Sequence, residues 1–314
     1  MRRTLIAVVG PTCTGKTGVS VALAERLTPA ELINADSRQL LRGLAVGTCA
    51  PTPAQLRGVT CHLLDLADPG EQFSVAAWTR AARAVVADLE SRRVLGVAVG
   101  GTGLYITALV DGLDFADVPP DPRTRAVRTA QAATPGGLSA LADQIRKRDP
   151  GGAQRLDLRN PRRVVRALEI LDARPGILAE LQQATPRHDT LLIGLDVPHD
   201  VHAAWIAERT SRMFRDGALF DEVSAARTRG VSDTALTASG IGYVEAIGVM
   251  DGTLRVDDAI ARTVQRTLRY AKSQRTYWRR DTRIEWDRAD TLDTDRLATL
   301  AVAEAEARPH QRGV

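Results

Sequence analysis

Cysteines are few in this sequence, and long apolar runs are missing from it. The three cysteines, Cys13, Cys49 and Cys61, have neither metal-ligand nor C-x-x-C spacing. This argues against a zinc site or a disulfide framework and suggests reduced thiols. No stretch approaches the roughly 18 apolar residues of a membrane span, and the apolar run after Arg3 is too short for a signal peptide and lacks a cleavage site. We expect a cytoplasmic protein with no membrane association.

Net charge is small overall, but basic residues are concentrated in two segments. The chain of 314 residues carries a formal charge of +4. Residues 121–166 hold 11 Arg or Lys against 4 Asp, and residues 262–283 hold 8 against one Asp. In the second segment Tyr270, Tyr277 and Trp278 interleave with the charges. Basic residues with aromatics favour contact with nucleic acid. The alternatives are a solvated helical face and aromatics that pack in a core.

One stretch has the full spacing of a phosphate-binding P-loop, G-x-x-x-x-G-K-T. It runs Gly10-Pro11-Thr12-Cys13-Thr14-Gly15-Lys16-Thr17, after an apolar run and before a segment of helical character. Its glycines let several backbone N–H groups face one anion, and the helix adds the positive end of its dipole. Lys16 would reach the terminal phosphates, and the Thr17 hydroxyl would bind a magnesium ion. The motif predicts binding of a di- or triphosphate, but NTPases, kinases and pyrophosphate-releasing transferases all use it.

Two further apolar runs end in residues suited to a ligand site. Asp36 follows the run at residues 31–35, and the turn Gly100-Gly101-Thr102-Gly103 follows the run at 94–99. Open parallel sheets bind ligands at the carboxyl ends of their strands. We therefore expect Asp36 and this second glycine turn to lie near the P-loop. Alternatively, Asp36 only caps a helix or closes an Asx turn.

The order of elements predicts an α/β fold, with a P-loop doubly wound parallel sheet and an inserted all-helical domain. Apolar strands alternate with helical segments up to Gly112, as in doubly wound sheets. Prolines near residue 119 mark a boundary, the following stretch is helical, and a strand-like run returns at residues 190–197. We predict a catalytic core over residues 1–117, a helical insertion over 118–187, and completion of the core with C-terminal helices over 188–314.

Taken together, these motifs resemble one family, the bacterial tRNA dimethylallyltransferases, also called tRNA isopentenyltransferases. The combination of the P-loop, the Asp36-Ser37 pair and the second glycine turn is specific, although no single piece is. The matches run in order over roughly residues 4–286 and comprise Gly10 to Thr17, Asn34 to Ser37, His62 to Asp65, Val99 to Tyr105, Asn160 to Arg163, Arg166 to Glu169, Gly194 to Asp196, Arg209, Gly242-Tyr243, and Tyr270 to Lys272 with Gln274. The chain departs from the family pattern at Trp205, Leu268 and Ser273.

The resemblance implies a reaction, its substrates and a cofactor. A dimethylallyl group would pass from dimethylallyl diphosphate to N6 of the adenosine just 3′ of the anticodon, in tRNAs that read U-starting codons, and diphosphate would leave. The family needs Mg²⁺ and usually acts as a monomer. Its helical insertion and C-terminal region surround the anticodon stem-loop of the tRNA.

The resemblance also implies roles for individual residues. The P-loop would hold the leaving diphosphate, Asp36 would accept the proton of N6, Thr102 would lie beside the reacting groups, and Arg209 would neutralise the diphosphate. The residues implied in tRNA binding are Asp36, Ser37, Arg38, Gln39, Thr102, Arg125, Arg162, Arg163, Val164, Val165, Arg166, Gly242 and Tyr243.

Three other functions remain open from the residues alone. The first is an isopentenyltransferase acting on free adenine nucleotides, as in cytokinin synthesis, although a small acceptor needs no basic insertion. The second is a P-loop kinase acting on a small molecule with ATP. The third is a non-catalytic protein that binds tRNA or a nucleotide.

Overall fold

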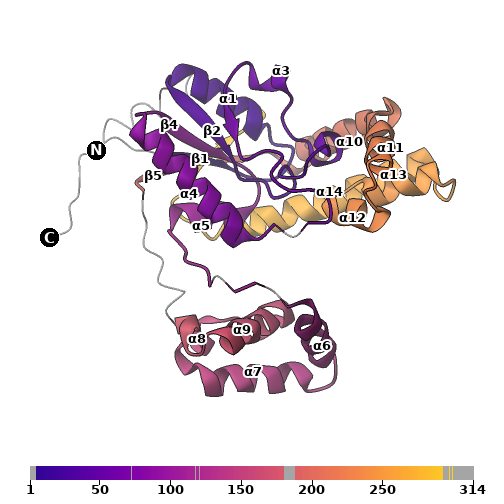
Figure 1. Ribbon diagram of the computed structural model, residues 1–314. Helices are drawn as coiled ribbons and strands as arrows, with labels where there is room; N and C mark the ends of the chain where they lie inside the picture. Colours follow the sequence, from indigo (N-terminus) through magenta and orange to yellow (C-terminus); the bar gives the residue numbers. More distant parts are fainter. Residues whose placement is uncertain are drawn as a thin grey trace. The chain divides into compact units, whose positions relative to one another are not determined.

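The structure, a computed structural model, describes residues 5–71, 73–116, 118–119, 121–179, 188–292, 297 and 299. The chain divides into two compact units (Figure 1). Unit 1 comprises Met1–Ile106 with His188–Val314, and unit 2 comprises Thr107–Arg187. The first division therefore falls within α5 (Gly103–Val110), earlier than the boundary between residues 117 and 118 that the sequence suggested.

A six-stranded, wholly parallel sheet forms the centre of unit 1. In spatial order its strands are β3 (Cys61–His62), β2 (Ala30–Asn34), β4 (Leu95–Val99), β1 (Leu5–Val9), β5 (Thr190–Asp196) and β6 (Glu285–Arg288). The central strand β1 pairs with both β4 and β5, so that Ala7 lies opposite Ala98 on one side and Leu192 on the other. The predicted α/β class with a parallel sheet is confirmed.

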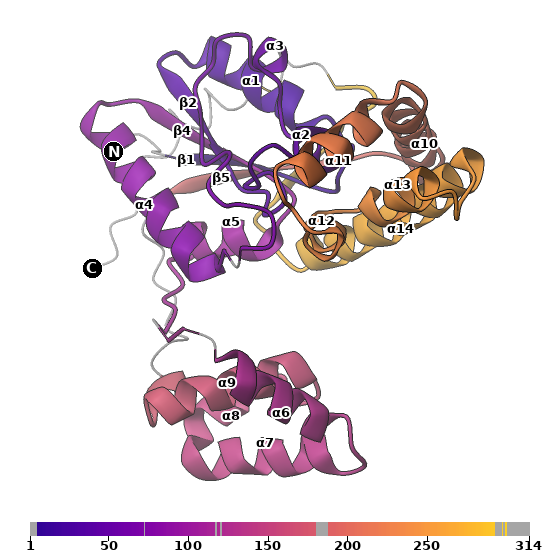
Figure 2. The ribbon, with the colours of Figure 1, turned by 45° about the vertical axis from the view of Figure 1, so that its right-hand side comes forward.

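The inner strands are apolar because helices cover both faces of the sheet. Helices α1 (Lys16–Arg26) and α4 (Val75–Ser91) lie on opposite faces (Figures 1 and 2). On the α1 face, Val19 and Leu23 pack in one cluster with Ile6, Val8 and Leu32. The edge strands β3 and β6 were not predicted, because they are short and carry no apolar run.

The remaining helices of unit 1 form a second core beside the sheet. Its centre contains Phe214, Leu219, Val223 and Tyr243, all at most 1% exposed. Helices α10 and α14 are the long elements here, and they lie in the segment over residues 188–314 for which C-terminal helices were predicted. The elements are α2 (Ala45–Thr48), α10 (His199–Arg215), α11 (Ala218–Thr228), α12 (Asp233–Ser239), α13 (Tyr243–Met250) and α14 (Val256–Trp278). The short helix α3 (Pro53–Leu56) instead packs beside α1, with Leu56 against the core of the sheet. Of the helices in the described part of the chain, none has both the length and the apolar character that a membrane crossing requires.

Unit 2 is helical and has a small core of its own. Leu141, Ile145, Val164, Leu168 and Leu171 pack together and are nearly inaccessible to solvent. Three of its helices begin with the same device: an Asp or Asn side chain accepts one or two backbone N–H groups of the first turn, and proline follows it. The elements are α6 (Pro122–Ala132), α7 (Gly137–Arg148), α8 (Pro150–Arg155), α9 (Pro161–Ala173) and the 3₁₀ turn η1 (Ile177–Ala179).

A buried carboxylate fastens α6 to α9. Glu169 is 6% exposed and accepts two hydrogen bonds from Arg125, both of 2.7 Å, and one of 2.9 Å from Arg166. Burial raises the pKa of Glu169, but the hydrogen bonds from both arginines outweigh burial and lower it. Arg166 also donates to the backbone carbonyl of Val118, at 2.7 Å. Arg125 and Arg166 therefore both have structural partners inside unit 2.

We predict that Glu169→Gln destabilises unit 2 without weakening unit 1. The amide cannot satisfy both arginines, and the loss should be on the order of 1–3 kcal/mol. All four tryptophans lie in unit 1, so tryptophan fluorescence in a urea titration reports that unit, whereas far-UV circular dichroism reports both. The helical signal should fall at lower urea while the fluorescence midpoint stays in place. Equal shifts of both signals would show that the contact does not act locally.

Candidate active site

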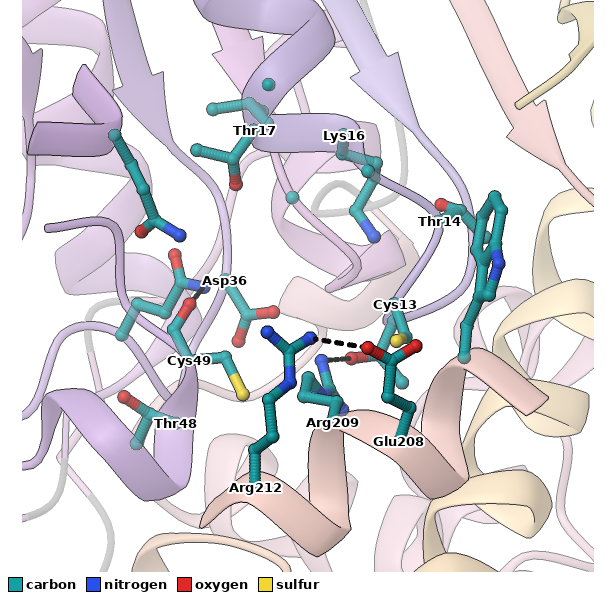
Figure 3. Close-up of a pocket in the computed structure, with 18 residues that line it drawn as sticks. Cys13, Thr14, Lys16, Thr17, Asp36, Thr48, Cys49, Glu208, Arg209 and Arg212 are labelled. Carbon is teal, nitrogen blue, oxygen red and sulfur yellow. Dashed lines mark hydrogen bonds and ion pairs between the residues drawn. The ribbon is translucent and has the colours of Figure 1, made fainter. Parts of the chain in front are cut away.

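The carboxyl ends of β1, β2 and β4 meet at one edge of the sheet, and a cavity of about 460 Å³ opens there. The loop after β1, Asp36 after β2 and Gly100 after β4 all line it. Parallel pairing brings these segments together because each strand ends at the same edge. Figure 3 shows Lys16, Thr17 and Asp36 around the cavity, with Glu208, Arg209 and Arg212 projecting into it from α10.

The loop after β1 has the backbone geometry of an anion-binding turn. Gly10 has φ of 140°, and a Cβ there would lie 2.2 Å from the carbonyl oxygen of Leu195. Cys13 and Gly15 also have positive φ, at 64° and 76°. Helix α1 begins at Lys16, so the unpaired N–H groups and positive dipole end of its first turn lie in the cavity wall. This arrangement suits a phosphate or diphosphate.

Lys16 is the cation nearest this loop, and its charge is sensitive to pH. Its ammonium group donates to the carbonyl oxygen of Pro11, at 2.5 Å. Burial lowers the pKa of Lys16 to about 8; the Asp36 carboxylate opposes this shift, and the Arg209 guanidinium adds to it. An anion bound in the cavity would favour the protonated form.

Asp36 is held by its own turn, yet it faces the cavity. Its backbone N–H donates to the side-chain oxygen of Asn34 (3.1 Å), and one of its carboxylate oxygens accepts the N–H of Arg38 (3.0 Å). The Asx-turn interpretation and the functional one are thus compatible. Figure 3 shows the carboxylate directed into the space between Lys16 and Arg212.

Thr102 and Ser37 join the second glycine turn to the Asp36 segment. The Thr102 hydroxyl accepts the N–H of Ser37 (3.0 Å) and donates to the Ser37 hydroxyl (3.2 Å). The Thr102 N–H donates to the carbonyl oxygen of Ala35, at 3.3 Å. Thr102 therefore lies directly beside the Asp36 turn, although it does not line the larger cavity.

Helix α10 lines the cavity with four side chains, of which the sequence analysis assigned only Arg209 to the site. Trp205, Glu208, Arg209 and Arg212 lie at i, i+3, i+4 and i+7, which is one face of a helix. Arg209 donates to the Thr12 hydroxyl (3.4 Å), and Arg212 pairs with Glu208 (3.5 Å). Trp205, Glu208 and Arg212 could have been predicted from sequence as site residues, because they share a helical face with Arg209.

A smaller cavity, of about 90 Å³, adjoins the first. The two share Thr12, Asp36, Thr48, Cys49 and Arg209. The smaller cavity extends to side chains of α10, the α12–α13 turn and α14, among them Met213, Ile241, Thr267 and Tyr270. Asp36 therefore borders both spaces, so it could act on a group in one while an anion occupies the other.

The donors near Thr17 suit a hard cation that is shared with phosphate oxygens. The Thr17 hydroxyl and the Asp36 carboxylate line the same cavity, and oxygen donors of this kind are those that Mg²⁺ prefers. In the described residues no group of three or more His, Cys, Asp or Glu could hold a metal by itself. A magnesium ion would thus need oxygens of the bound ligand and water.

The side chains of three of the predicted tRNA contacts are buried. Val164 and Val165 are 0% and 4% exposed and belong to the interior of unit 2, and Tyr243 is 0% exposed and donates its hydroxyl to Glu222 (2.8 Å). Gly242, with φ of 108°, begins α13. The side chains of Val164, Val165 and Tyr243 therefore stabilise the fold, and contact of these residues with tRNA stays a prediction.

The other predicted contacts divide into exposed and engaged side chains. Arg162 and Arg163 are exposed in the first turn of α9, whereas Arg125 and Arg166 bind Glu169. In unit 1, Arg38 donates to the backbone of Ala238, and Gln39 donates to that of Cys49. Of the interleaved aromatics, Trp278 is buried, Tyr277 is 39% exposed, and Tyr270 lines the smaller cavity.

The fold and site define a class: α/β proteins that bind a phosphorylated ligand on a glycine-rich loop at the carboxyl edge of a parallel sheet. Comparison with known families narrows this class. The IPP transferase family model matches residues 39–281, and the chain belongs to this family.

Several relatives are similar over nearly the whole chain. The tRNA dimethylallyltransferase of Thermobifida fusca is 41% identical over 306 residues, covering 96% of this chain and 95% of the relative, and that of Kineococcus radiotolerans is 41% identical over 314 residues, covering 96% and 98%. The crystal structure of the tRNA isopentenylpyrophosphate transferase of Bacillus halodurans is similar with a TM-score of 0.70, 33% identity and 98% coverage of both chains. A eukaryotic dimethylallyltransferase acting on tRNA has the same fold, with a TM-score of 0.80 at 22% identity, covering 99% of this chain and 81% of its own.

We predict that inorganic diphosphate binds more weakly as pH rises through about 8. In the free protein Lys16 loses its proton over that range, and only the ammonium form attracts the anion. Titration calorimetry in buffers of different ionisation enthalpy should detect proton uptake on binding near pH 8.

Lys16→Arg provides the control, because its side chain stays charged throughout this range and any remaining pH dependence belongs to diphosphate itself. The prediction fails if the wild-type protein and this variant show the same pH dependence.

Proposed function

We propose that this protein is a tRNA dimethylallyltransferase. It transfers the dimethylallyl group of dimethylallyl diphosphate to N6 of the adenosine 3′-adjacent to the anticodon, in tRNAs that read U-starting codons, and releases diphosphate. The observation that carries the proposal is that the loop with Lys16 and the carboxylate of Asp36 face each other across the same cavity. The family membership supports the same reaction.

The leaving diphosphate would occupy the glycine-rich loop. The N–H groups of the loop, Lys16 and Arg209 would stabilise the negative charge that develops on the leaving oxygen as the allylic C–O bond breaks. Thr17 would hold Mg²⁺, which supplies further charge neutralisation when bound. The electron pair of the broken bond leaves on the diphosphate, and the allylic carbon becomes electrophilic.

Asp36 would accept the proton of the attacking amine. N6 of adenosine is a weak nucleophile because its lone pair is delocalised into the ring, so proton removal during attack assists the reaction. The new C–N bond forms as the proton passes to Asp36. Thr102 and Ser37 would keep this carboxylate aimed at the reacting groups. The target base must leave the stack of the anticodon loop, at a cost of a few kcal/mol.

Unit 2 would bind the tRNA backbone through its exposed arginines. Phosphate contacts fix the position of a nucleic acid but do not read its sequence. We further propose that the enzyme acts as a monomer in the cytoplasm, as the family resemblance suggests.

The decisive test is a prenylation assay on unmodified tRNA with dimethylallyl diphosphate and Mg²⁺. Mass spectrometry of the digested tRNA should show N6-dimethylallyladenosine. Parallel reactions with AMP as acceptor and with ATP as donor test the alternatives. Prenylation of AMP alone would indicate the cytokinin-type enzyme, and phosphate transfer from ATP without prenylation would indicate a kinase.

We predict that Asp36→Asn lowers turnover by at least about 10²-fold, the usual contribution of a general base. The amide oxygen can still accept the N–H of Arg38, so the turn persists while the base is lost. Binding of tRNA, measured by filter binding, should stay close to that of the wild type. Near-normal turnover would remove Asp36 from the proposed role.

We also predict that Arg162→Ala with Arg163→Ala weakens tRNA binding and lowers its salt dependence. Removing two phosphate contacts should reduce the slope of log affinity against log salt by about 2. Arg146→Ala with Lys147→Ala is the matched control, since it removes the same charge from the exposed end of α7. Equal effects of the two double variants would mean that only net charge matters.

A further inference from the structure

Both backbone groups of Thr12, in the loop after β1, are held by buried side chains that the proposed reaction does not use. The N–H of Thr12 donates to the side-chain oxygen of Gln274 on α14, at 2.8 Å. Its carbonyl oxygen lies 2.8 Å from Nε2 of His202 on α10. Gln274 is 5% exposed and His202 is fully buried. Two long helices thus clamp consecutive peptides of the loop.

The contacts of His202 fix its protonation state. A carbonyl oxygen can only accept, so Nε2 must carry a hydrogen, and a guanidinium can only donate, so Nδ1 must be the acceptor for Arg275 at 2.7 Å. Arg275 is itself held by Asp196 at the end of β5, also at 2.7 Å. His202 is therefore the neutral Nε2–H tautomer. Through these hydrogen bonds His202 connects the loop after β1 to Arg275 on α14 and to Asp196 at the end of β5.

The clamp on Thr12 also sets the direction of the next N–H group. In a trans peptide the carbonyl and N–H point in opposite directions, so a Thr12 carbonyl bound to His202 turns the N–H of Cys13 away from His202. Within the described chain this N–H has no hydrogen-bond partner, and Cys13 lines the cavity. It is thus available to a bound anion, whereas the N–H of Thr12 is already occupied by Gln274.

Gln274 has a second contact that links the two glycine turns. Its amide nitrogen donates to the carbonyl oxygen of Gly101, at 3.0 Å. Gly101 directly precedes Thr102, which is bonded to Ser37 beside the proposed base. A Cβ on Gly101 would lie 2.2 Å from the Gln274 amide nitrogen, so only glycine leaves room for this side chain. The side-chain amide of Gln274 therefore connects the loop after β1 to the glycine turn next to Asp36.

We propose that His202 and Gln274 are positioning residues. His202 holds the loop after β1 in its anion-binding conformation before a ligand binds. Gln274 fixes the position of this loop relative to the turn at Gly101 and Thr102, which supports Asp36. The inference deepens the proposed function and rests on it for the transfer step, but its effect on anion binding is independent of the acceptor.

The first experiment measures the affinity for inorganic diphosphate by calorimetry. His202→Phe and Gln274→Met should each weaken it by roughly 3- to 10-fold, the effect of one hydrogen bond that orders the loop. His202→Gln, which keeps an amide donor for Thr12 and an oxygen for Arg275, should recover most of the loss. Gln265→Met is the control, because Gln265 lies exposed on the same helix. Unchanged affinity in both test variants, an equal loss in the control, or no recovery by His202→Gln would each overturn the proposal.

The second experiment separates positioning from folding. Gln274→Met and Gly101→Ala should lower the single-turnover rate of prenyl transfer by roughly 10- to 100-fold, as expected for a misplacement of about 1 Å, with little change in the KM for tRNA. Melting temperatures identify any variant that loses its fold, and Gly101→Ala tests the same contact from the other side. Wild-type transfer rates in both variants would overturn the role of Gln274. If the wild type binds diphosphate but does not prenylate tRNA, the proposed function fails while the diphosphate experiment still decides the role of His202.

Discussion

The parallel pairing of β1 with both β4 and β5 is the constraint on which the site depends. It places the ends of β1, β2 and β4 at one edge, so that the glycine-rich loop, Asp36 and the second glycine turn converge without long connections. The close approach of Gly10 to the backbone of Leu195 continues this pairing beyond the strand. A side chain at Gly10 would push the loop away from β5 and move Lys16 with it.

The charges that line the cavity favour the binding of an anion. Lys16 and Arg209 face one buried region, and their mutual repulsion adds to the desolvation that lowers the pKa of Lys16. A single carboxylate, Asp36, compensates in part. A bound diphosphate would relieve the repulsion and leave Asp36 free to take a proton. In the proposed reaction the same charges would serve both binding and the leaving group, and the carboxylate would change role when the anion binds.

Much of the fold could be predicted from sequence, because the sheet is buried on both faces. Runs such as Leu5–Val9 and Leu95–Val99 are continuously apolar, and the glycine turns follow them directly. The polar edge strand β6 leaves no comparable pattern. His202 and Gln274 could not be assigned a function either, since the groups of the loop that they hold are backbone atoms far away in the chain, and backbone contacts leave no signature in residue type.

Val164 and Val165 show a distinction that the family motif alone does not make. The family motif treats residues 162–166 as one strip, but a helix turns successive residues through about 100°. Arg162 and Arg163 are therefore exposed, while the valines enter the interior. Helical periodicity, applied to the motif, separates the two sets.

Fewer arginines of unit 2 are free to bind an anion than the number of its basic residues suggests. Two carboxylates each hold two arginines: Glu169 binds Arg125 and Arg166, and Asp172 binds Arg128 and Arg148. Each group of three keeps one net positive charge and is fixed in position by the fold. Arg162 and Arg163, exposed at the start of α9, keep their full charge and their freedom to adjust to a phosphate. The distribution of partners, rather than the number of arginines, therefore determines which part of this surface can respond to a nucleic acid.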